Sequence, residues 1–135
     1  MKYLVDVNIL SEATRPTPSA KVIEWLRQNE ANLSIDAVIL GEIRLGILLL
    51  PSGKRRSNLE SWFEHGITRL ACLPWDAAIA NQWASLLAKL RNKGKSMPLK
   101  DSMIAATAIH HKLTIVTRNV ADFKSTNLQI INPFD

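Results

Sequence analysis

The sequence has one cysteine, no long hydrophobic run and fewer acidic than basic residues. Because Cys72 is the one cysteine, an internal disulfide is excluded. Its place in the apolar run Leu70–Leu73 predicts a small buried side chain without a chemical role. No segment approaches the roughly 20 apolar residues that a membrane-spanning helix needs, and the N-terminus lacks the pattern of a signal peptide. We therefore expect a cytoplasmic protein without membrane contact.

Acidic residues are outnumbered, with 12 Asp and Glu against 17 Lys and Arg. A basic surface favours polyanionic partners, nucleic acid first. The composition, 47% hydrophobic and 21% charged, is typical of a globular protein. A chain of 135 residues fits one domain, residues 1–135, that buries a core without disulfides or structural metal.

Short apolar runs alternate with longer amphipathic segments along the chain. β-branched and apolar content predicts five strands: Tyr3–Val5, Leu33–Ile35, Leu70–Leu73, Leu113–Thr117 and Leu128–Ile131. Helical periodicity predicts helices from Ser19, over 37–50, from Lys54, over 77–92 and around Asp101. This order predicts the α/β class, as a three-layer α/β/α sandwich around a central parallel sheet.

Asp6 directly follows the first predicted strand. Polar residues at the carboxyl ends of parallel strands face the crevice in which α/β proteins bind their ligands. The alternative is that Asp6 only caps the short helical segment 8–12. One aspartate does not decide between the two, but three later segments offer a carboxylate or an amide in a comparable setting.

Glu42 is the first of these, in a predicted helix that is apolar on nearly all sides. Such a helix is buried on most of its surface, in the core or partly in a dimer interface. A carboxylate taken out of water needs a cation, a proton or a metal ion. Arg44 is a poor partner for Glu42, because residues two apart point in different directions on a helix.

The other two segments lie near the C-terminus. Asp101 lies at the start of an alanine-rich helix. Either its side chain caps this helix, or its carboxylate points into the same crevice as Asp6. Asn119 follows a predicted strand as Asp6 does, and Asp122 comes one helical turn later. Asp36 also follows a predicted strand, but its interpretation is a helix N-cap alone, like that of Asp76.

The carboxyl ends of parallel strands share one edge of the sheet, so these groups are expected to meet. Three carboxylates plus an amide or a fourth carboxylate repel one another unless a hard divalent cation neutralises them. Oxygen-only ligands suit Mg²⁺ or Mn²⁺, and no cluster of cysteine and histidine competes for zinc. Such an ion orients a water, makes it more acidic and stabilises charge on a phosphoryl oxygen.

The order and spacing of these segments resemble PIN-domain proteins of the VapC toxin type, FitB-like. The matching stretches are Leu4–Ser11, Gly41–Gly46, Pro98–Ala108, Thr117–Phe123 and the closing Asn132–Phe134. The resemblance implies a PIN-like fold and a Mg²⁺- or Mn²⁺-dependent endoribonuclease, the toxin of a toxin–antitoxin system. It also implies a homodimer that a VapB-like antitoxin inhibits, and contact with operator DNA only through that antitoxin.

Carried onto this sequence, the resemblance makes Asp6 and Asp101 the main metal ligands and Glu42 a third acidic group, ligating directly or through water. Asn119 completes the catalytic set, although many relatives have an aspartate there. Either its amide oxygen serves, or Asp122 takes over this position as a metal ligand. Asn8 and Ser11 are expected to support the site through hydrogen bonds.

Two other functions remain open at this point. Haloacid-dehalogenase-like phosphatases also carry a nucleophilic aspartate after their first strand, although Asp6-Val-Asn8 departs from their usual Asp-x-Asp. A catalytically silent RNA-binding or partner-binding module is the second alternative. The basic segments Lys54–Arg56 and Arg91–Lys95 either contact RNA or are solvated helix ends.

Overall fold

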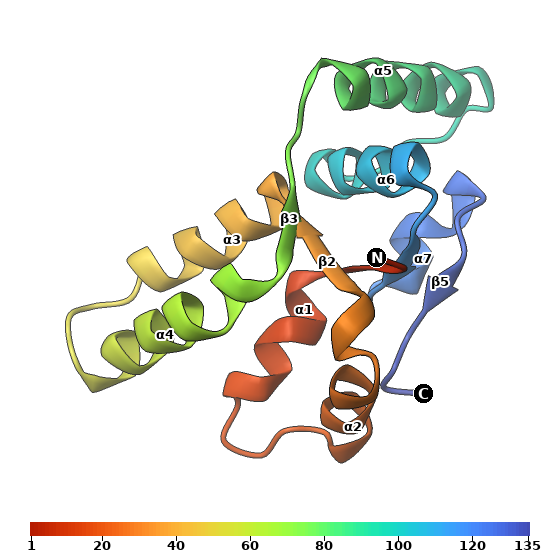
Figure 1. Cartoon of the computed structure of the whole chain (residues 1–135). Helices are drawn as coiled ribbons and strands as arrows, with labels where there is room; N and C mark the ends of the chain where they lie inside the picture. Colours follow the sequence, from red (N-terminus) through yellow and green to blue (C-terminus); the bar gives the residue numbers. More distant parts are fainter.

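The computed structural model describes all 135 residues and is built on a five-stranded parallel sheet with the order β3-β2-β1-β4-β5 (Figure 1). The strands are β1 (Tyr3–Val5), β2 (Leu33–Asp36), β3 (Ala71–Leu73), β4 (Thr114–Val116) and β5 (Ile130–Ile131). Their ends differ from the predicted ends by two residues at most. The prediction of an α/β sandwich with a parallel sheet is confirmed.

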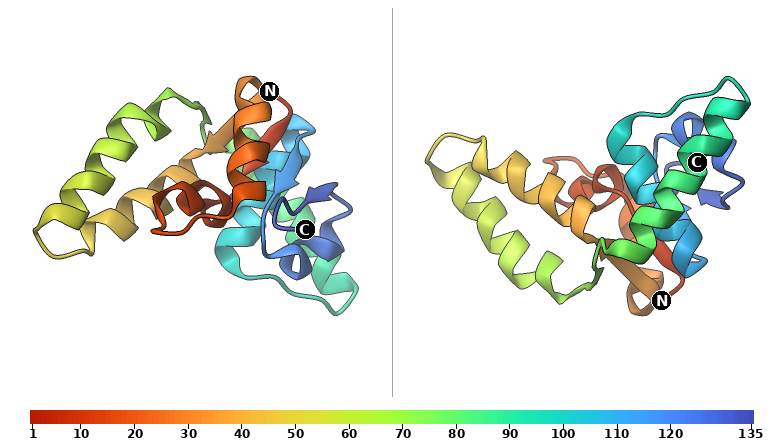
Figure 2. Two further views of the ribbon diagram at one scale, coloured as in Figure 1. Left: turned by 90° about the horizontal axis from the view of Figure 1, so that it is seen from below. Right: turned by 90° about the horizontal axis from the view of Figure 1, so that it is seen from above.

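Helices cover both faces of this sheet, with α5 and α6 on one side and α1 and α2 on the other (Figure 1). The helices are α1 (Val7–Leu10), α2 (Ala20–Gln28), α3 (Ala37–Leu48), α4 (Lys54–His65), α5 (Ala77–Asn92), α6 (Leu99–His111) and α7 (Val120–Phe123). Four short 3₁₀ segments are η1 (Ser11–Thr14), η2 (Glu30–Asn32), η3 (Ile67–Arg69) and η4 (Lys124–Thr126). Helices α3 and α4 form a hairpin that projects from the body (Figure 2). No helix is both long and apolar enough to span a membrane.

Side-chain caps begin several of these helices. The carboxylates of Asp36 and Asp76 accept the N–H groups of Ile39 and Ile79 at 2.8 and 3.2 Å. Each bond satisfies a donor that the first turn of a helix leaves unpaired, so both N-cap predictions are confirmed. Asp101 is not a cap, because α6 begins at Leu99. Its carboxylate is therefore available for another role.

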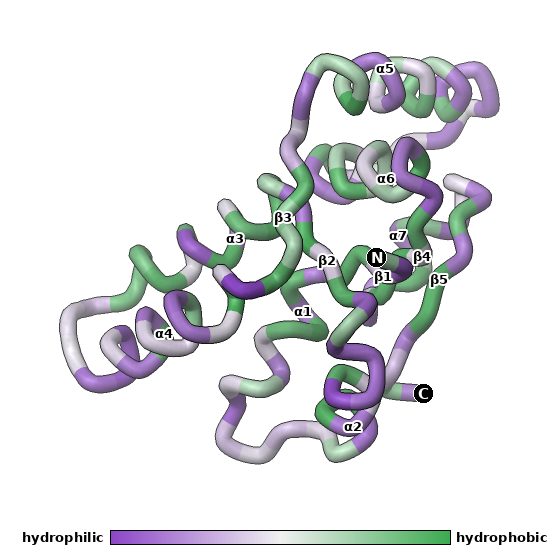
Figure 3. Tube along the Cα trace, viewed as in Figure 1, coloured by the Kyte–Doolittle hydropathy of each residue, from purple (hydrophilic) through white to green (hydrophobic).

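Helix α3 is less buried than its composition predicts. It is almost continuously apolar (Figure 3), yet Leu45, Leu48 and Leu49 at its far end are 52%, 46% and 75% exposed. Only the side that carries Ile39, Ile43 and Ile47 packs into the core. Of the two predicted alternatives, burial in the core was wrong, because the α3–α4 hairpin extends beyond the sheet. Partial burial in a dimer interface stays a prediction.

Cys72 was predicted to be buried and is exposed instead. It lies in β3, which is the edge strand of the sheet and has only β2 as a neighbour. In this strand Leu73 alone is buried. An apolar run read without its position in the sheet does not distinguish an edge strand from a central one.

The strand order explains which polar residues come together. Strand β1 is central, with β2 on one side and β4 on the other, and Val5 lies opposite Val116. The residues after these two, Asp6 and Thr117, are therefore neighbours at the carboxyl edge. Apolar residues make up most of the strands (Figure 3), and those of the central strands β1 and β4 belong to the core, so the edge is where polar side chains gather.

Candidate active site

Asp6 is held at both of its oxygens at this edge. It is 5% exposed, and its Oδ1 accepts the N–H of Val7 at 2.8 Å. Its Oδ2 accepts the hydroxyl of Thr117 at 2.8 Å and the amide of Asn8 at 3.4 Å. Burial raises the pKa of Asp6, and these hydrogen bonds oppose the shift. Asp6 thus both caps α1 and faces the other carboxylates.

Thr117 belongs to the site although the sequence analysis gave it no role. Its hydroxyl donates to Asp6 and accepts the backbone N–H of Asn119 at 3.1 Å and the amide of Asn8 at 3.4 Å. It is fully buried. The signal that identifies it is positional: Thr117 follows a central strand directly, as Asp6 does. A hydroxyl so placed fixes the orientation of the carboxylate beside it.

Glu42 meets a cation, but only at one of its oxygens. Its Oε2 lies 3.9 Å from Nζ of Lys100, whereas its buried Oε1 has no hydrogen-bond partner. Burial raises the pKa of Glu42, and the charge of Lys100 counteracts this. Arg44 pairs with Glu60 at 3.5 Å instead, which confirms that it is not the partner. A buried oxygen without a donor is costly, and a bound cation would relieve that cost.

Asp101 and Asp122 face each other. Burial raises the pKa of Asp101 to about 6, helped by the negative charge of Asp6 and by the direct contact with Asp122. The charge of Glu42 adds to the shift. Carboxylates that crowd in this way resist ionisation unless a positive charge joins them. The pKa of Asp101 is therefore the clearest electrostatic sign of an acidic cluster.

Asn119 and Asp122 occupy different surroundings. Asn119 is exposed, and its backbone N–H, rather than its side chain, is the group that bonds to Thr117. Asp122 is half-buried, and its charge contributes to the raised pKa values of Asp6 and Asp101. Of the two candidates for the fourth position, the structure brings Asp122 to the other carboxylates. The catalytic role given to Asn119 stays a prediction.

The two supporting residues also differ. Asn8 donates to Asp6, and its Oδ1 accepts the backbone N–H of Arg118 at 3.1 Å, so it ties α1 to the segment after β4. Ser11 follows α1 as its C-cap and lines a hollow beside Glu42. Its side chain makes no hydrogen bond with Asp6. The contact predicted for Asn8 is thus present, and that for Ser11 is not.

Asp36 is a further carboxylate near this edge. It is fully buried, burial raises its pKa, and its negative charge contributes to the raised pKa of Glu42. The sequence analysis treated it as a helix cap alone. Its hydrogen bond to Thr107 at 2.6 Å, 71 residues away, links α3 to α6. No local pattern in the sequence predicts a bond over that separation.

The chemistry of these donors fits a hard divalent cation. Asp6, Glu42, Asp101 and Asp122 offer only oxygen, and the pKa values of the first three are raised. As they stand, no three acidic or histidine side chains are arranged to hold an ion. The unpartnered Oε1 of Glu42 is nevertheless the kind of atom that an ion satisfies. Side-chain rotation would be part of binding.

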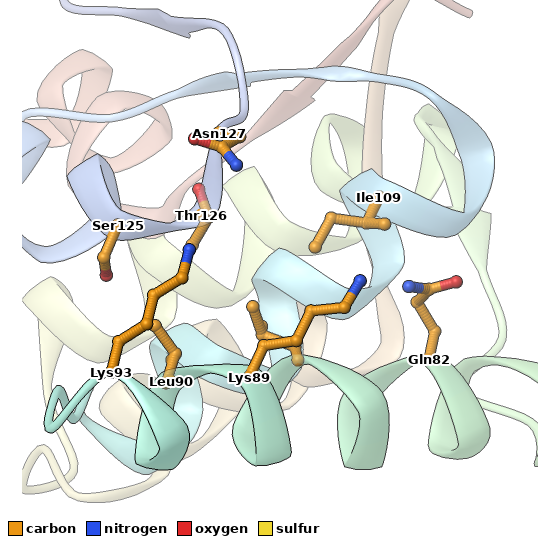
Figure 4. Close-up of a pocket in the computed structure, with 9 residues that line it drawn as sticks. Gln82, Lys89, Leu90, Lys93, Ile109, Ser125, Thr126 and Asn127 are labelled. Atoms are coloured by element: carbon orange, nitrogen blue, oxygen red, sulfur yellow. The ribbon is translucent and has the colours of Figure 1, made fainter.

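Two hollows flank the molecule at different places. One, of about 220 Å³, lies between α3 and α4, and its lining combines apolar residues with Glu42 and Arg55. The other lies between α5 and the turn at Ser125–Asn127, where Lys89 and Lys93 project over it (Figure 4). None of the site carboxylates lines the second hollow. The hollow beside Glu42 adjoins the candidate site, and so does a third, more open hollow lined by Asn119 and Asp122.

The raised pKa of Asp101 has a consequence for stability. Between about pH 4 and pH 6 the folded, metal-free protein binds more protons at Asp101 than the unfolded chain, so this contribution to stability is lost as the pH rises through 6. We expect the wild type to lose more thermal stability than Asp101→Asn between pH 5 and pH 7.5. Melting curves in a chelator measure this, and identical pH profiles for the two proteins would contradict it.

A model of the PIN domain matches residues 3–127. The chain belongs to the PIN-domain family. The match includes all four site carboxylates, so the acidic edge lies within the family's own domain and not in an added segment.

Curated PIN-domain relatives match this chain over nearly its whole length. The toxin FitB of Neisseria gonorrhoeae is 33% identical, with 97% of each chain covered. The VapC ribonuclease Y4jK of Sinorhizobium fredii is 31% identical, with 98% of this chain and 97% of the relative covered. The family resemblance inferred from the sequence is confirmed.

A solved structure supports the same PIN-domain assignment. FitAB bound to a DNA fragment superposes with a TM-score of 0.92 at 32% identity, covering 98% of this chain and 96% of the FitAB chain. The haloacid-dehalogenase alternative is excluded, because the whole chain follows the PIN-domain architecture instead. A catalytically silent module would have the same fold, so an activity assay is what separates it from an enzyme.

Proposed function

We propose that this protein is a divalent-metal-dependent endoribonuclease and the toxin of a toxin–antitoxin pair. The observation that carries the proposal is the convergence of Asp6, Glu42, Asp101 and Asp122 at one sheet edge, with raised pKa values at three of them. Relatives named as VapC ribonucleases support the reaction class. Relatives solved as FitAB and VapBC complexes support the pairing with an antitoxin.

In this proposal the metal is Mg²⁺ or Mn²⁺, which supplies an acidified water and stabilises charge on the phosphoryl oxygen. Asp6 is the anchoring ligand, because hydrogen bonds to both of its oxygens hold it still. Asp101 and Asp122 would be further ligands. Glu42 would complete the set from α3, directly or through a water. Asn119 is exposed and lines a hollow together with Asp122, where its amide could contact RNA.

The test is cleavage of RNA by the purified protein with Mg²⁺, with Mn²⁺ and with a chelator. We expect products only when metal is present, and an end-labelled RNA of mixed sequence shows whether internal bonds are cut. Absence of cleavage with either metal across a panel of structured and single-stranded RNAs contradicts the enzyme. RNA or antitoxin binding without cleavage would then favour the silent module.

The acidic edge repels phosphate, so a substrate strand needs cations nearby. Arg55 lines the hollow beside Glu42, and Lys54 and Arg55 share the adjoining hollow with Thr14. Arg56 is already engaged, bonding to Glu60 at 3.2 Å and to the carbonyl of Leu50 at 3.3 Å. We propose that Lys54 and Arg55 guide RNA toward the site.

The second basic segment, Arg91–Lys95, lies at the C-terminal end of α5. Helix α5 runs for 16 residues from its cap at Asp76, which places its far end about 24 Å along the helix axis from that cap. This segment therefore suits phosphates outside the cleaved stretch of RNA.

Neutralising the guiding cations should weaken RNA binding in a salt-dependent way. We expect the double change Lys54→Gln, Arg55→Gln to reduce the slope of log affinity against log salt by about 1.4, for two lost contacts with single-stranded RNA. The matched control is Arg56→Gln, which removes a charge held by Glu60 and should change the slope less. Fluorescence anisotropy without metal measures both. An unchanged slope after neutralising both basic segments would contradict guidance.

The antitoxin is proposed to cover the hollow beside Glu42. The apolar part of this hollow is lined by Ile43 and Ile47 from α3 and by Leu59 and Trp62 from α4. A segment lying across α2 and α3 could bury apolar side chains there and direct an arginine at the free oxygen of Glu42. Arginine suits this role because its planar fork binds a carboxylate at two points. Operator DNA would be contacted through the antitoxin.

A homodimer is also proposed, as the family resemblance implies. The exposed leucines at the end of α3, Leu45, Leu48 and Leu49, are the surface that a second copy would bury. Sedimentation of the purified protein tests this.

A further inference from the structure

A buried hydrogen bond joins the two helices that carry Glu42 and Asp101. Oδ2 of Asp36 accepts the hydroxyl of Thr107 at 2.6 Å, while Oδ1 of Asp36 accepts the N–H of Ile39 at 2.8 Å. Both Asp36 and Thr107 are 0% exposed. The carboxylate is therefore held at both oxygens, and water cannot replace its partner. None of the roles given above uses this contact.

The bond between Asp36 and Thr107 is equally far along the sequence from the two site carboxylates. Glu42 lies six residues after Asp36, and Asp101 lies six residues before Thr107. Along an α-helix six residues span about 9 Å. The far ends of these two spans also meet, because Lys100, next to Asp101, lies 3.9 Å from Glu42. Equal spans from one fixed contact bring the two site carboxylates to the same level.

Other contacts between α3 and α6 hold the alignment of Glu42 with Asp101 only weakly. The pair of Lys100 and Glu42 is long, and the Lys100 side chain is 60% exposed, so it adjusts easily. Around Thr107 the α6 residues that face the core include Ala105, Ala106 and Ala108. Small side chains interlock less deeply than large ones, so they resist sliding poorly. A directional bond between buried groups is better suited to set the register.

We propose that Asp36 and Thr107 form a clamp that sets the register of α3 against α6 and thereby tunes the affinity of the site for its divalent cation. Both are positioning residues that act through Glu42 and Asp101. Mg²⁺ demands near-ideal octahedral geometry at about 2.1 Å, whereas Ca²⁺ accepts flexible surroundings at 2.3–2.6 Å. Loss of the clamp therefore affects Mg²⁺ more than Ca²⁺. The inference rests on the proposed metal site and adds the residues that shape it.

The test is metal binding by Thr107→Val, which keeps the shape of the side chain and removes the hydroxyl. We expect its dissociation constant for Mg²⁺ to rise about tenfold and that for Ca²⁺ to rise less than threefold. Thr107→Ser restores the hydroxyl and should bind both ions within twofold of the wild type. Asp36→Asn keeps a side chain able to bond with Thr107 but removes the charge, so its Mg²⁺ preference over Ca²⁺ should also persist. Competition against Mn²⁺, followed by electron paramagnetic resonance, measures these constants without RNA.

A matched control separates register from general weakening. Ser34→Ala removes another buried hydroxyl, which donates to the carbonyl of Tyr3 at 2.7 Å within the sheet. We expect it to lower thermal stability as Thr107→Val does, and to leave the Mg²⁺ to Ca²⁺ ratio unchanged. An equal change of that ratio in Ser34→Ala, or none in Thr107→Val, overturns the clamp while the proposed function stands. A wild type that binds no divalent ion and cuts no RNA overturns both.

Discussion

Asp101→Asn is expected to abolish RNA cleavage and to make the metal-free protein more stable. Loss of a metal ligand should cost more than the roughly 10- to 100-fold that loss of an outer partner of a metal site costs. Stability should rise because a carboxylate with a pKa of about 6, crowded by Asp6 and Asp122, becomes a neutral amide of the same shape. A gain of a few degrees in melting temperature is the expected size.

Adding metal separates the loss of a ligand from the relief of charge repulsion. In a chelator the variant should melt above the wild type, and with millimolar Mn²⁺ the order should reverse, because only the wild type gains from binding. Asp76→Asn is the matched control: Asp76 caps α5 and contributes to none of the raised pKa values of the acidic cluster, and asparagine caps helices about as well. It should change neither activity nor melting. Full activity in Asp101→Asn, or a fall in its metal-free melting temperature, would reject the acidic-site assignment.

Asp6→Asn should be equally inactive but should gain less stability. Both oxygens of Asp6 accept hydrogen bonds, from Val7 at one side and from Thr117 and Asn8 at the other. An amide in its place can accept at one side only and turns a second donor toward Asn8. The lost acceptor offsets the relief of repulsion. Comparison of the two variants in a chelator therefore tests whether hydrogen bonds or repulsion dominate at Asp6.

Expression of this chain alone should stop bacterial growth, and co-expression of its antitoxin should restore it. The expected effect is large because an active ribonuclease turns over many RNA molecules. Asp101→Asn should be harmless with or without the partner, and Asp76→Asn should remain toxic. The candidate partner is a short DNA-binding protein encoded beside this gene. Growth unaffected by the wild-type chain in its native host would contradict the toxin role.

The arginine that the antitoxin is proposed to direct at Glu42 leads to a second prediction. Replacing the inserted arginine by glutamine should leave the partner able to bind but less able to neutralise the toxin, because its cation no longer reaches Glu42. Glu42→Gln should weaken the complex from the other side. Titration of antitoxin into a cleavage assay measures both. A glutamine variant that inhibits as well as the original would show that the antitoxin acts by covering the site alone.

Prediction from the sequence succeeded where the signal was local. The strand before Asp6 and the caps at Asp36 and Asp76 rest on neighbouring residues, and the structure has them as predicted. The need of Glu42 for a cation, a proton or a metal ion followed from its apolar surroundings, and the exclusion of Arg44, which followed from helix geometry, was correct. Each of these depends on only a few consecutive residues.

Prediction failed where the outcome depends on distant parts of the chain. Cys72 is exposed because β3 is an edge strand, which its own sequence does not reveal. The roles of Thr117 and Thr107 come from partners 111 and 71 residues away. Choosing between Asn119 and Asp122 likewise requires knowing where α7 packs. Strand order and helix register set these contacts, and neither can be read from local periodicity.

The pairing of β1 with β4 has a consequence for how the protein is made. Asp6 obtains its hydroxyl partner only when Thr117 has been synthesised, and at about 5–20 residues per second the ribosome needs roughly 6–20 seconds to add the intervening residues. The central strand waits through that time for its second neighbour. The nascent chain therefore cannot hold a finished site until Thr117 has been synthesised and β4 has paired with β1.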